Sequence, residues 1–369
     1  MCSHLRSLFF LDHSAVQDKN VLVNLIYIAT GFAHQSVIIF FVLSGLLISK
    51  SVLYPVRDGT WSWKAYLINR GVRLYVVLFP GMLLCAFWDH LGLGLNGAQT
   101  FYAHAVPDLG DWRALDGMGF STFLGNLTFL QSVFFQPFGS NSPLWSLSYE
   151  FWYYMLFPLL VLAGSRASSW RSRIGYFALA SLISLMVGSR IILYFIMWLA
   201  GAVVALPQLA SWRRSRKGFG LLGLVSVAAF GVALAISRFD GLSHFGDLHL
   251  FVIAFLFVPV LEAIVRIDGQ ARPGAYASLS GLLAGFSYTL YLTHMPLLFF
   301  IRASLASQPR WQPDGLHLAY GATIALALLA YAYGVYWLTE SRTDRVRSYV
   351  RKVLNDYGIL GPVVKEKAV

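Results

Sequence analysis

The sequence predicts an all-α protein, a polytopic integral membrane helix bundle with about nine full spans and a truncated first helix. Three observations predict this class. Hydrophobic residues make up 57% of the 369 positions and charged residues only 12%, whereas a soluble domain carries about 25% charged residues. Apolar stretches of about 20 residues, long enough to cross a bilayer, recur along nearly the whole chain. Basic residues gather in alternate connections, as is typical of loops on the cytoplasmic side of a membrane.

The spans follow from the apolar stretches taken in chain order. A short apolar stub covers residues 5–11. Beyond it we expect spans near residues 34–53, 74–93, 144–164, 174–189, 191–210, 218–236, 248–265, 279–301 and 317–338. Residues 1–340 then form one membrane domain, and residues 341–369 form a basic tail. The start lacks the charged segment and cleavage site of a signal peptide, so we expect no cleavage there.

The distribution of basic residues assigns the two sides of the membrane. Of the 28 Lys and Arg residues, 21 fall in every second connection or in the tail, and six fall in the remaining connections. The richer set is cytoplasmic by the positive-inside rule, so we expect a cytoplasmic C-terminus. Because the net charge of +11 is spread over these loops, it does not indicate a nucleic-acid partner. Cys2 and Cys85 form neither a disulfide framework nor a metal-ligand spacing, so we expect no metal.

The connection of residues 94–143 is unusually long, lies on the opposite side, and is rich in Gly, Asp, Asn and Trp. A helix bundle does not need a connection of this length, so we expect it to cover a functional region. No internal repeat and no second domain accompany it.

Few ionisable residues fall inside the expected spans, where a charge is costly and marks a functional candidate. These residues are His4, His34, Glu150 and His294. Glu262, His90 and Arg190 lie near span ends, where long side chains reach the interface. A lone histidine such as His294 suits a structural hydrogen bond as well as it suits a functional role.

The segment INRGVRLY places Arg70 and Arg73 on one helical face at the cytoplasmic edge, because residues three apart are neighbours. Two guanidinium groups there suit the phosphates of a soluble cofactor. They also suit a positive-inside anchor beside anionic lipid, and the spacing alone favours this anchor.

The segment NSPLWSLSYEFWYY places Glu150 two turns into a helix that begins at Pro143. A carboxylate at that depth needs a partner. Nearby aromatic residues such as Trp145 and Tyr153 suit a sugar-binding wall, although aromatic belts are ordinary at membrane interfaces. Small residues in an earlier span, such as Ser44 in FFVLSGLLIS, suit close packing of helices.

Taken together, these segments resemble the membrane acyltransferase-3 family, which acylates sugars and other acceptors at the bacterial envelope. The family's signatures occur in order as HQSVIIFFVLSGLLIS, RGVRLY followed by Pro80, NLTFLQ, SPLWSLSYEFWYY and FSYTLYLTHMP. Each motif alone is weak, but the set in this order over residues 1–300 is specific. The resemblance implies about ten helices, a multi-pass protein of the bacterial inner membrane, and an acyltransferase domain over residues 1–340.

The first helix of the family carries an arginine, ten intervening residues and then a histidine that looks like the catalytic base. SHLRSLFF resembles the end of that helix, so His4 matches the histidine and the arginine falls upstream of Met1. We therefore expect the protein to start upstream, with this chain beginning inside the first helix. His13 is a poorer match, because it lies past the apolar stub and Cys2 stands eleven residues before it.

The resemblance implies an O-acyl transfer, with acetyl as the default group, from cytoplasmic acyl-coenzyme A to a hydroxyl of an envelope glycan or glycolipid, such as exopolysaccharide or lipopolysaccharide. In this assignment His4 and Glu150 are catalytic, and Arg70 and Arg73 bind the phosphates of acetyl-CoA. The residues that line the site come from the same motifs: Ser44, Trp145, Ser146, Tyr153, Tyr288 and His294.

Two other classes stay open. A multi-span transporter or flippase for a sugar- or acyl-containing molecule shares the spans, the midplane polar residues and the basic loops, although the sequence lacks the related halves that many transporters show. A structural or sensory membrane protein would tolerate changes of Arg70, Glu150 and His294. Acceptor-dependent consumption of acetyl-CoA separates the enzyme from both.

Overall fold

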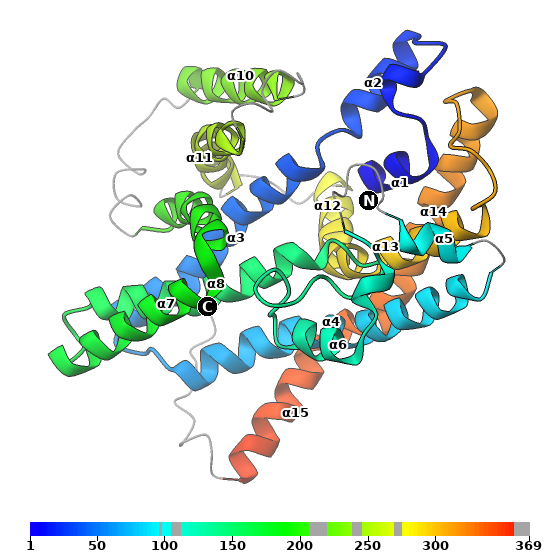
Figure 1. The fold of residues 1–369 in the computed structure, drawn as a ribbon. Coiled ribbons are helices and arrows are strands. Elements are labelled where there is room, and N and C mark those ends of the chain that lie inside the picture. The colour runs from blue at the N-terminus through cyan, green and yellow to red at the C-terminus, as the bar shows by residue number, and fades with distance from the viewer. Residues whose placement is uncertain (96–97, 105–111, 207–219, 238–245, 269–274, 358–369) are drawn as a thin grey trace.

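The computed structural model describes residues 1–369 except 96–97, 105–111, 207–219, 238–245, 269–274 and 358–369. The described residues form helices and turns with no strand among them, which confirms the predicted all-α class. The helices follow one another as α1 (Cys2–Phe9), α2 (Val21–Ala29), α3 (Ala33–Arg57), α4 (Trp63–Leu93), α5 (Ala98–Ala103), α6 (Phe120–Leu127), α7 (Leu144–Gly164), α8 (Trp170–Val204), α10 (Gly220–Ile236), α11 (Leu248–Asp268), α12 (Ala275–Gly285), α13 (Ser287–Ser304), α14 (Gly315–Leu338) and α15 (Thr343–Asp356) (Figure 1).

The largest apolar core lies where α3, α7 and α8 pack against one another, with residues of α4 and α11 also contributing. The close approach of α3 to α8 depends on two glycines. A side chain at Gly45 would meet the carbonyl of Trp198, and one at Gly201 would meet the carbonyl of Val42. The small residues of FFVLSGLLIS therefore allow the close helix packing that they predict.

A second apolar core joins α1 to α13 and α14. Phe9 and Phe10, at the end of α1, belong to the same cluster as Met295 and Phe299 of α13. Because a helix rises 1.5 Å per residue, the eight residues of α1 are too few to cross a membrane. The apolar stub is instead buried against longer helices.

Part of the predicted set of spans is identified by length and hydropathy in the described residues. By length and hydropathy, five helices of the described part can cross a membrane: α3, α4, α8, α11 and the helix that begins at Gly315. A sixth span is possible if α12 and α13, which are bent by 53° relative to each other, cross together. The spans predicted at 174–189 and 191–210 correspond to the two halves of α8, which is broken at Gly188 (φ +83°) with no connecting loop between the halves.

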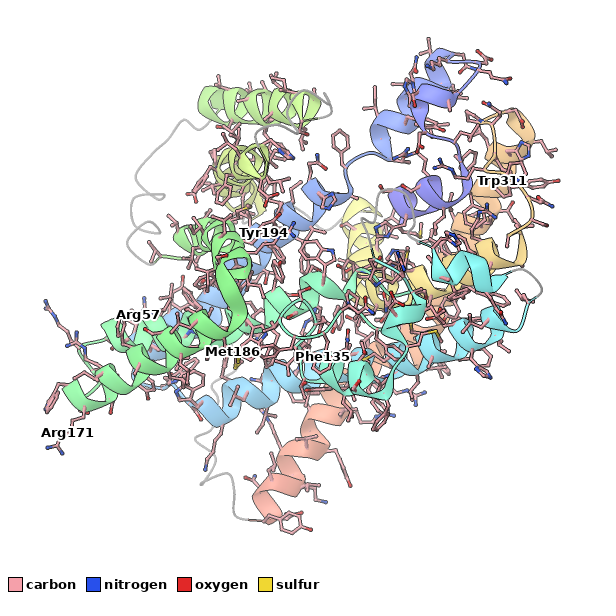
Figure 2. The ribbon with its side chains drawn as sticks, viewed as in Figure 1. Arg57, Phe135, Arg171, Met186, Tyr194 and Trp311 are labelled. Atoms are coloured by element: carbon pink, nitrogen blue, oxygen red, sulfur yellow. The ribbon has the colours of Figure 1, made fainter. Side chains whose placement is uncertain are left out.

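Three labelled residues show where some of the predicted connections lie. Arg57 and Arg171, from two connections of the basic-rich group, lie at one end of the view in Figure 2, and Trp311, from a basic-poor connection, lies at the opposite end. These three positions are consistent with the predicted separation of the two groups, and the assignment of the cytoplasmic side stays a prediction. Other basic positions of the rich group, at 213–217 and 272, lie outside the described residues.

The second half of the long 94–143 connection is tied to the start of α7. The carbonyl of Phe129 accepts hydrogen bonds from Oγ of Ser148 at 2.7 Å and from Nε1 of Trp152 at 2.9 Å. The role of this connection as a cover stays a prediction. The described part of the basic tail forms α15, where Arg351 donates to Oδ1 of Asn69 in α4 at 3.2 Å.

Candidate functional site

His4 of α1 and His294 of α13 are hydrogen-bonded to each other, although 290 residues separate them in the chain. Nδ1 of His4 lies 3.0 Å from Nε2 of His294. The rings are 3° from parallel, with centroids 5.2 Å apart. Because the two nitrogens are much closer than the centroids, the rings meet edge to edge in nearly one plane. Two histidines that the sequence predicts from distant motifs therefore form one pair.

The hydrogen-bond partners assign the tautomer of each ring. Nδ1 of His294 lies 2.8 Å from the carbonyl oxygen of Leu290 and 3.0 Å from that of Tyr291. Since carbonyls only accept, this nitrogen carries the proton, and Nε2 of the neutral His294 ring is an acceptor. Nδ1 of His4 then donates to it, so Nε2 of His4 carries no proton. An imidazole in this form can accept a proton from a hydroxyl group.

The C-terminal end of α1 is held by α13 and by the segment that follows α13. Nε of Arg302 donates at 3.0 Å to the carbonyl of Leu8, one of the carbonyls that a helix end leaves without a helical partner. The backbone N–H of Trp311 donates to the carbonyl of Phe9 at 2.7 Å. Because α13 also carries His294, these contacts fix the position of α1 relative to its histidine partner.

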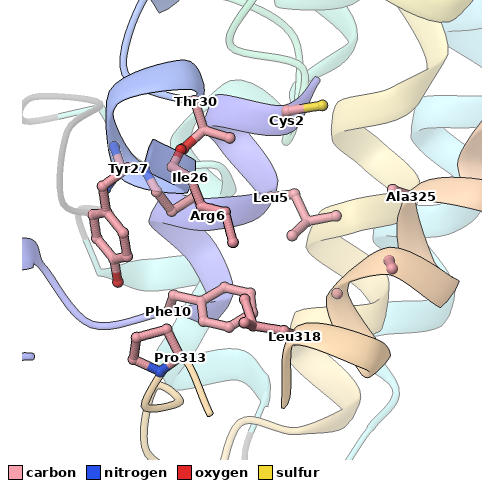
Figure 3. A pocket seen from close by; sticks show the side chains of 12 residues that line it. Cys2, Leu5, Arg6, Phe10, Ile26, Tyr27, Thr30, Pro313, Leu318 and Ala325 are labelled. Atoms are coloured by element: carbon pink, nitrogen blue, oxygen red, sulfur yellow. The ribbon is translucent and has the colours of Figure 1, made fainter. Parts of the chain in front are cut away.

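A largely apolar recess of about 230 Å³ lies beside α1, with α2 and α14 forming its other walls (Figure 3). Cys2, Leu5 and Arg6 line it from α1, and Leu318 and Ala325 line it from α14. The residues that line the recess do not include either histidine of the pair. The recess and the histidine pair therefore use different residues of α1.

Glu150 of α7 is the centre of a second buried network. Its Oε1 accepts a hydrogen bond from Oγ of Ser44 in α3 at 2.9 Å, and another from the hydroxyl of Tyr154 one turn further along α7. Nε1 of Trp198 in α8 donates to Oγ of Ser44 at 3.2 Å. The carboxylate is 6% exposed and has the partners that its depth requires. The network joins three helices at one point.

The two arginines of RGVRLY lie near this network. The guanidinium of Arg70 lies over the rings of Tyr66 and Tyr154, 5.8 and 6.0 Å from their centroids. Nε of Arg70 is buried without a hydrogen-bond partner in the described part of the chain. Arg73, one turn later, is exposed and acts electrostatically on Glu150. A guanidinium with an unpartnered donor suits an anionic ligand such as a phosphate.

Ser146 connects the SPLWSL segment to Tyr291, in the turn of α13 before His294. Its Oγ is hydrogen-bonded to the hydroxyl of Tyr291, which also contacts the carbonyl of Pro143 at 2.6 Å. Tyr291 lies one turn before His294, and the centroids of these two rings are 6.3 Å apart. Ser146 is therefore linked through Tyr291 to the turn of α13 that carries His294, and its role as a lining residue stays a prediction.

The other three predicted lining residues contact other parts of the bundle. Trp145 packs edge-on against a neighbouring tyrosine, with ring centroids 5.1 Å apart. The hydroxyl of Tyr153 donates to the carbonyl of Ile191 at 3.0 Å, and the hydroxyl of Tyr288 donates to the carbonyl of Leu74 at 3.2 Å. A role of these residues toward a substrate stays a prediction.

The predicted site residues thus form two groups, one around the histidine pair and one around Glu150. Three partners in these groups were not among the predicted site residues: Tyr154, Trp198 and Tyr291. Helical spacing is a signal for two of them, because Tyr154 is four residues after Glu150 and Tyr291 is three residues before His294. Trp198 has no such signal, since it lies 154 residues from Ser44 in the chain.

Comparison with known proteins gives one match. A family model described as an acyltransferase domain matches residues 1–336, a range that includes both groups of site residues. No curated protein and no solved structure matches the chain.

Proposed function

Because the chain belongs to the acyltransferase 3 family, we propose that it transfers an acyl group, acetyl by default, from acyl-coenzyme A to a hydroxyl of an envelope or exported glycan or glycolipid. The observation that carries this proposal is the hydrogen bond between His4 and His294. It assigns to His4 the tautomer whose Nε2 can accept a proton. A hydroxyl acceptor needs such a base, and the unperturbed pKa of imidazole, about 6.5, suits the role.

In the proposed reaction, Nε2 of His4 takes the proton of the acceptor hydroxyl while the hydroxyl oxygen attacks the thioester carbonyl carbon. The C–S bond then breaks, and His4 gives the proton to the leaving thiolate, so that the products are an ester and free coenzyme A. His294 accepts a hydrogen bond from Nδ1 of His4 throughout and stabilises the imidazolium. General base catalysis of this kind contributes about 10²–10⁴-fold to a rate.

The donor would approach from the side on which Arg70 and Arg73 lie. Nε of Arg70 is buried and has no hydrogen-bond partner among the described residues, which supports a role for this pair in holding the phosphates of coenzyme A. Glu150, which shares Tyr154 with Arg70, would orient the donor between the arginines and the histidine pair. This orientation requires an inner-membrane protein with the arginines and the C-terminus in the cytoplasm.

The test compares the wild-type protein with His4→Ala in a strain that lacks the gene. We expect the wild type to restore ester-linked acetate on surface glycans, measured by NMR, and to consume acetyl-CoA in isolated membranes. The His4→Ala protein should insert normally and lose about 10²–10⁴-fold in rate. His13→Ala is the matched control, because His13 is hydrogen-bonded to Asn24 in an exposed connection and should keep full activity.

Normal acylation by His4→Ala would contradict the role of this histidine as the base. A wild type that never consumes acetyl-CoA with any glycan acceptor would contradict the transferase. If such a protein moved a glycan across the membrane of sealed vesicles, that result would support the alternative function, a transporter, in place of the transferase.

A further inference from the structure

Pro296 leaves a carbonyl group of α13 without its helical partner, two residues after His294. In an α-helix each carbonyl accepts from the N–H four residues later, and proline has no N–H. The carbonyl of Leu292 is therefore released from the helical pattern. It is enclosed in protein, since Leu292 is 1% exposed. A buried carbonyl needs another donor.

Asn141 supplies that donor. Its Nδ2 donates to the carbonyl of Leu292 at 2.8 Å, and its side chain is 1% exposed. Asn141 lies in the segment just before α7, 151 residues from Leu292 in the chain. This bond therefore joins the α7 entrance to α13 at the point where Pro296 interrupts α13.

The segment that carries Asn141 is itself held by α4. The backbone N–H of Ser140 donates to Oδ2 of Asp89, a carboxylate of α4 that is 0% exposed, at 2.7 Å. Gly139 has φ +53°, and a side chain there would collide with Asp89. Asn141 thus reaches α13 from a fixed position, because its neighbours are bonded to a buried group.

The released carbonyl lies within the turn that orients His294. Nδ1 of His294 contacts the carbonyls of Leu290 and Tyr291, which directly precede that of Leu292. The hydroxyl of Tyr291 also reaches the same entrance segment, at the carbonyl of Pro143. A shift of this turn therefore moves the ring that accepts the hydrogen bond from His4.

A second proline of the bundle shows the same arrangement. Pro158 of α7 releases the carbonyl of Tyr154, and the hydroxyl of Tyr66 in α4 donates to that carbonyl at 3.0 Å. Tyr154 is the residue whose hydroxyl contacts Glu150. In both places a side chain from another element donates a hydrogen bond to the carbonyl that a proline releases. Each of these carbonyls lies next to one group of candidate site residues.

We propose that Asn141 is a positioning residue for the acyl transfer. By bonding to the carbonyl that Pro296 releases, it holds the turn of α13 in which Nε2 of His294 faces His4. Asn141 does not contact the reacting atoms. This inference rests on the proposed function, because the property that it explains is the orientation of the proposed base.

The test is a double-mutant cycle of Asn141→Leu and Pro296→Ala. Asn141→Leu keeps the size of the side chain and removes the donor, so we expect kcat to fall about 100-fold, the effect typical of a small misplacement of a reacting group. KM for acetyl-CoA should not change. In the Pro296→Ala background, residue 296 has an N–H that can bond to Leu292, so Asn141→Leu should lower kcat by less than about 10-fold relative to Pro296→Ala alone.

Gln131→Leu is the matched control. Gln131 is also fully buried, and its Nε2 donates to a backbone carbonyl, that of Leu144 in α7, at 3.0 Å. We expect this change to lower the melting temperature and to change kcat by less than about threefold, which is the range of kcat values expected among neutral variants. Its effect should be the same with and without Pro296→Ala.

The melting temperatures of the same cycle do not depend on catalysis. We expect Asn141→Leu to lower the melting temperature less in the Pro296→Ala background than in the wild type. If the wild type is active and Asn141→Leu lowers kcat equally in the wild-type and Pro296→Ala backgrounds, the positioning role is overturned and the proposed function is not. A wild type that transfers no acyl group would overturn the proposed function, whatever the melting temperatures show.

Discussion

Gly201 of α8 lies directly against the carbonyl group of Val42 in α3. Gly45 of α3 makes the corresponding contact with the carbonyl of Trp198. The two helices therefore cross with their backbones in contact, and this crossing brings Nε1 of Trp198 to Ser44 in the Glu150 network. A change that separates the helices should act on both stability and the network.

Gly201→Ala should destabilise the protein, because the new methyl group would overlap the backbone of α3. Overpacking of this kind costs about 1–3 kcal/mol, which thermal unfolding in detergent would detect as a lower melting temperature. Gly175→Ala is the control in the same helix, since an added methyl group there meets nothing within 4 Å. Gly175→Ala should be neutral or stabilise by up to about 1 kcal/mol. Equal effects of the two changes would contradict the close crossing.

Glu150→Gln should lower activity while leaving the protein inserted. The change keeps the shape but removes the charge that accepts from Ser44 and Tyr154, and hydrogen bonds to a charged group contribute about 1.5–3 kcal/mol. We therefore expect kcat/KM for acetyl-CoA to fall roughly 10–100-fold, by the factor of ten per 1.4 kcal/mol. Glu262→Gln makes the same chemical change in α11 and should have no such effect. A fully active Glu150→Gln protein would remove Glu150 from the catalytic assignment.

Arg70→Ala should weaken binding of donors that carry the phosphates of coenzyme A. We expect KM for acetyl-CoA to rise roughly 10–100-fold, since a charge-assisted hydrogen bond contributes about 1.5–3 kcal/mol. KM for acetyl-pantetheine, which lacks these phosphates, should not change. Arg57→Ala is the control, because Arg57 is exposed and forms its ion pair with the adjacent Asp58. An equal rise of KM for both donors would indicate a structural role for Arg70.

Asp12 and Arg310 should make stability sensitive to acid. Their ion pair, with N and O 2.7 Å apart, joins the end of α1 to the segment before α14. The hydrogen bond from Arg310 lowers the pKa of Asp12 below its ordinary value. The stabilisation is therefore fully present above the unfolded pKa, about 3.9, and disappears as the pH falls through the lower pKa of the folded state.

The measurement for this pair is the melting temperature between pH 7 and pH 3. An exposed ion pair contributes about 0.2–1 kcal/mol, so Asp12→Asn should lower the melting temperature slightly at pH 7 and lose its effect at acid pH. Asp18→Asn is the control, because the carboxylate of Asp18 accepts a local hydrogen bond from the side chain of Asn20, and its effect should be the same in the two conditions. If Asp12→Asn changed the melting temperature by the same amount at pH 7 and at pH 3, the stabilising role of the Asp12–Arg310 ion pair would be contradicted.

The residues of the candidate site could be chosen from the sequence because they lie in motifs, and helical spacing then indicates which of them share a face. His4, Glu150 and His294 are ionisable residues in apolar segments, which is a signal that needs no structure. Their partners are different. Ser44 and Trp198 meet across α3 and α8, and no pattern in the chain predicts a contact between residues 154 positions apart.

The sequence predicted the class of the fold, a helical membrane protein, more fully than it predicted how the individual helices join. Composition and apolar periodicity determine that the chain is helical and suited to a membrane, because lipid accepts only backbones whose hydrogen bonds are satisfied internally. The same pattern predicted two spans in the region of α8 but not how they join, since the two halves of α8 meet at a break at Gly188 without the polar loop that marks a connection.

The sequence by itself determined the helical membrane class, the basic and apolar pattern of the chain, and the residue types that can perform acyl transfer. Only the tertiary structure decided that His4 donates to His294, and that Asn141 bonds to the carbonyl released by Pro296. The physical reason is that local hydrogen bonding and apolar burial are encoded residue by residue. The direction of a side chain depends instead on how distant helices pack, through contacts such as that of Gly201 with Val42.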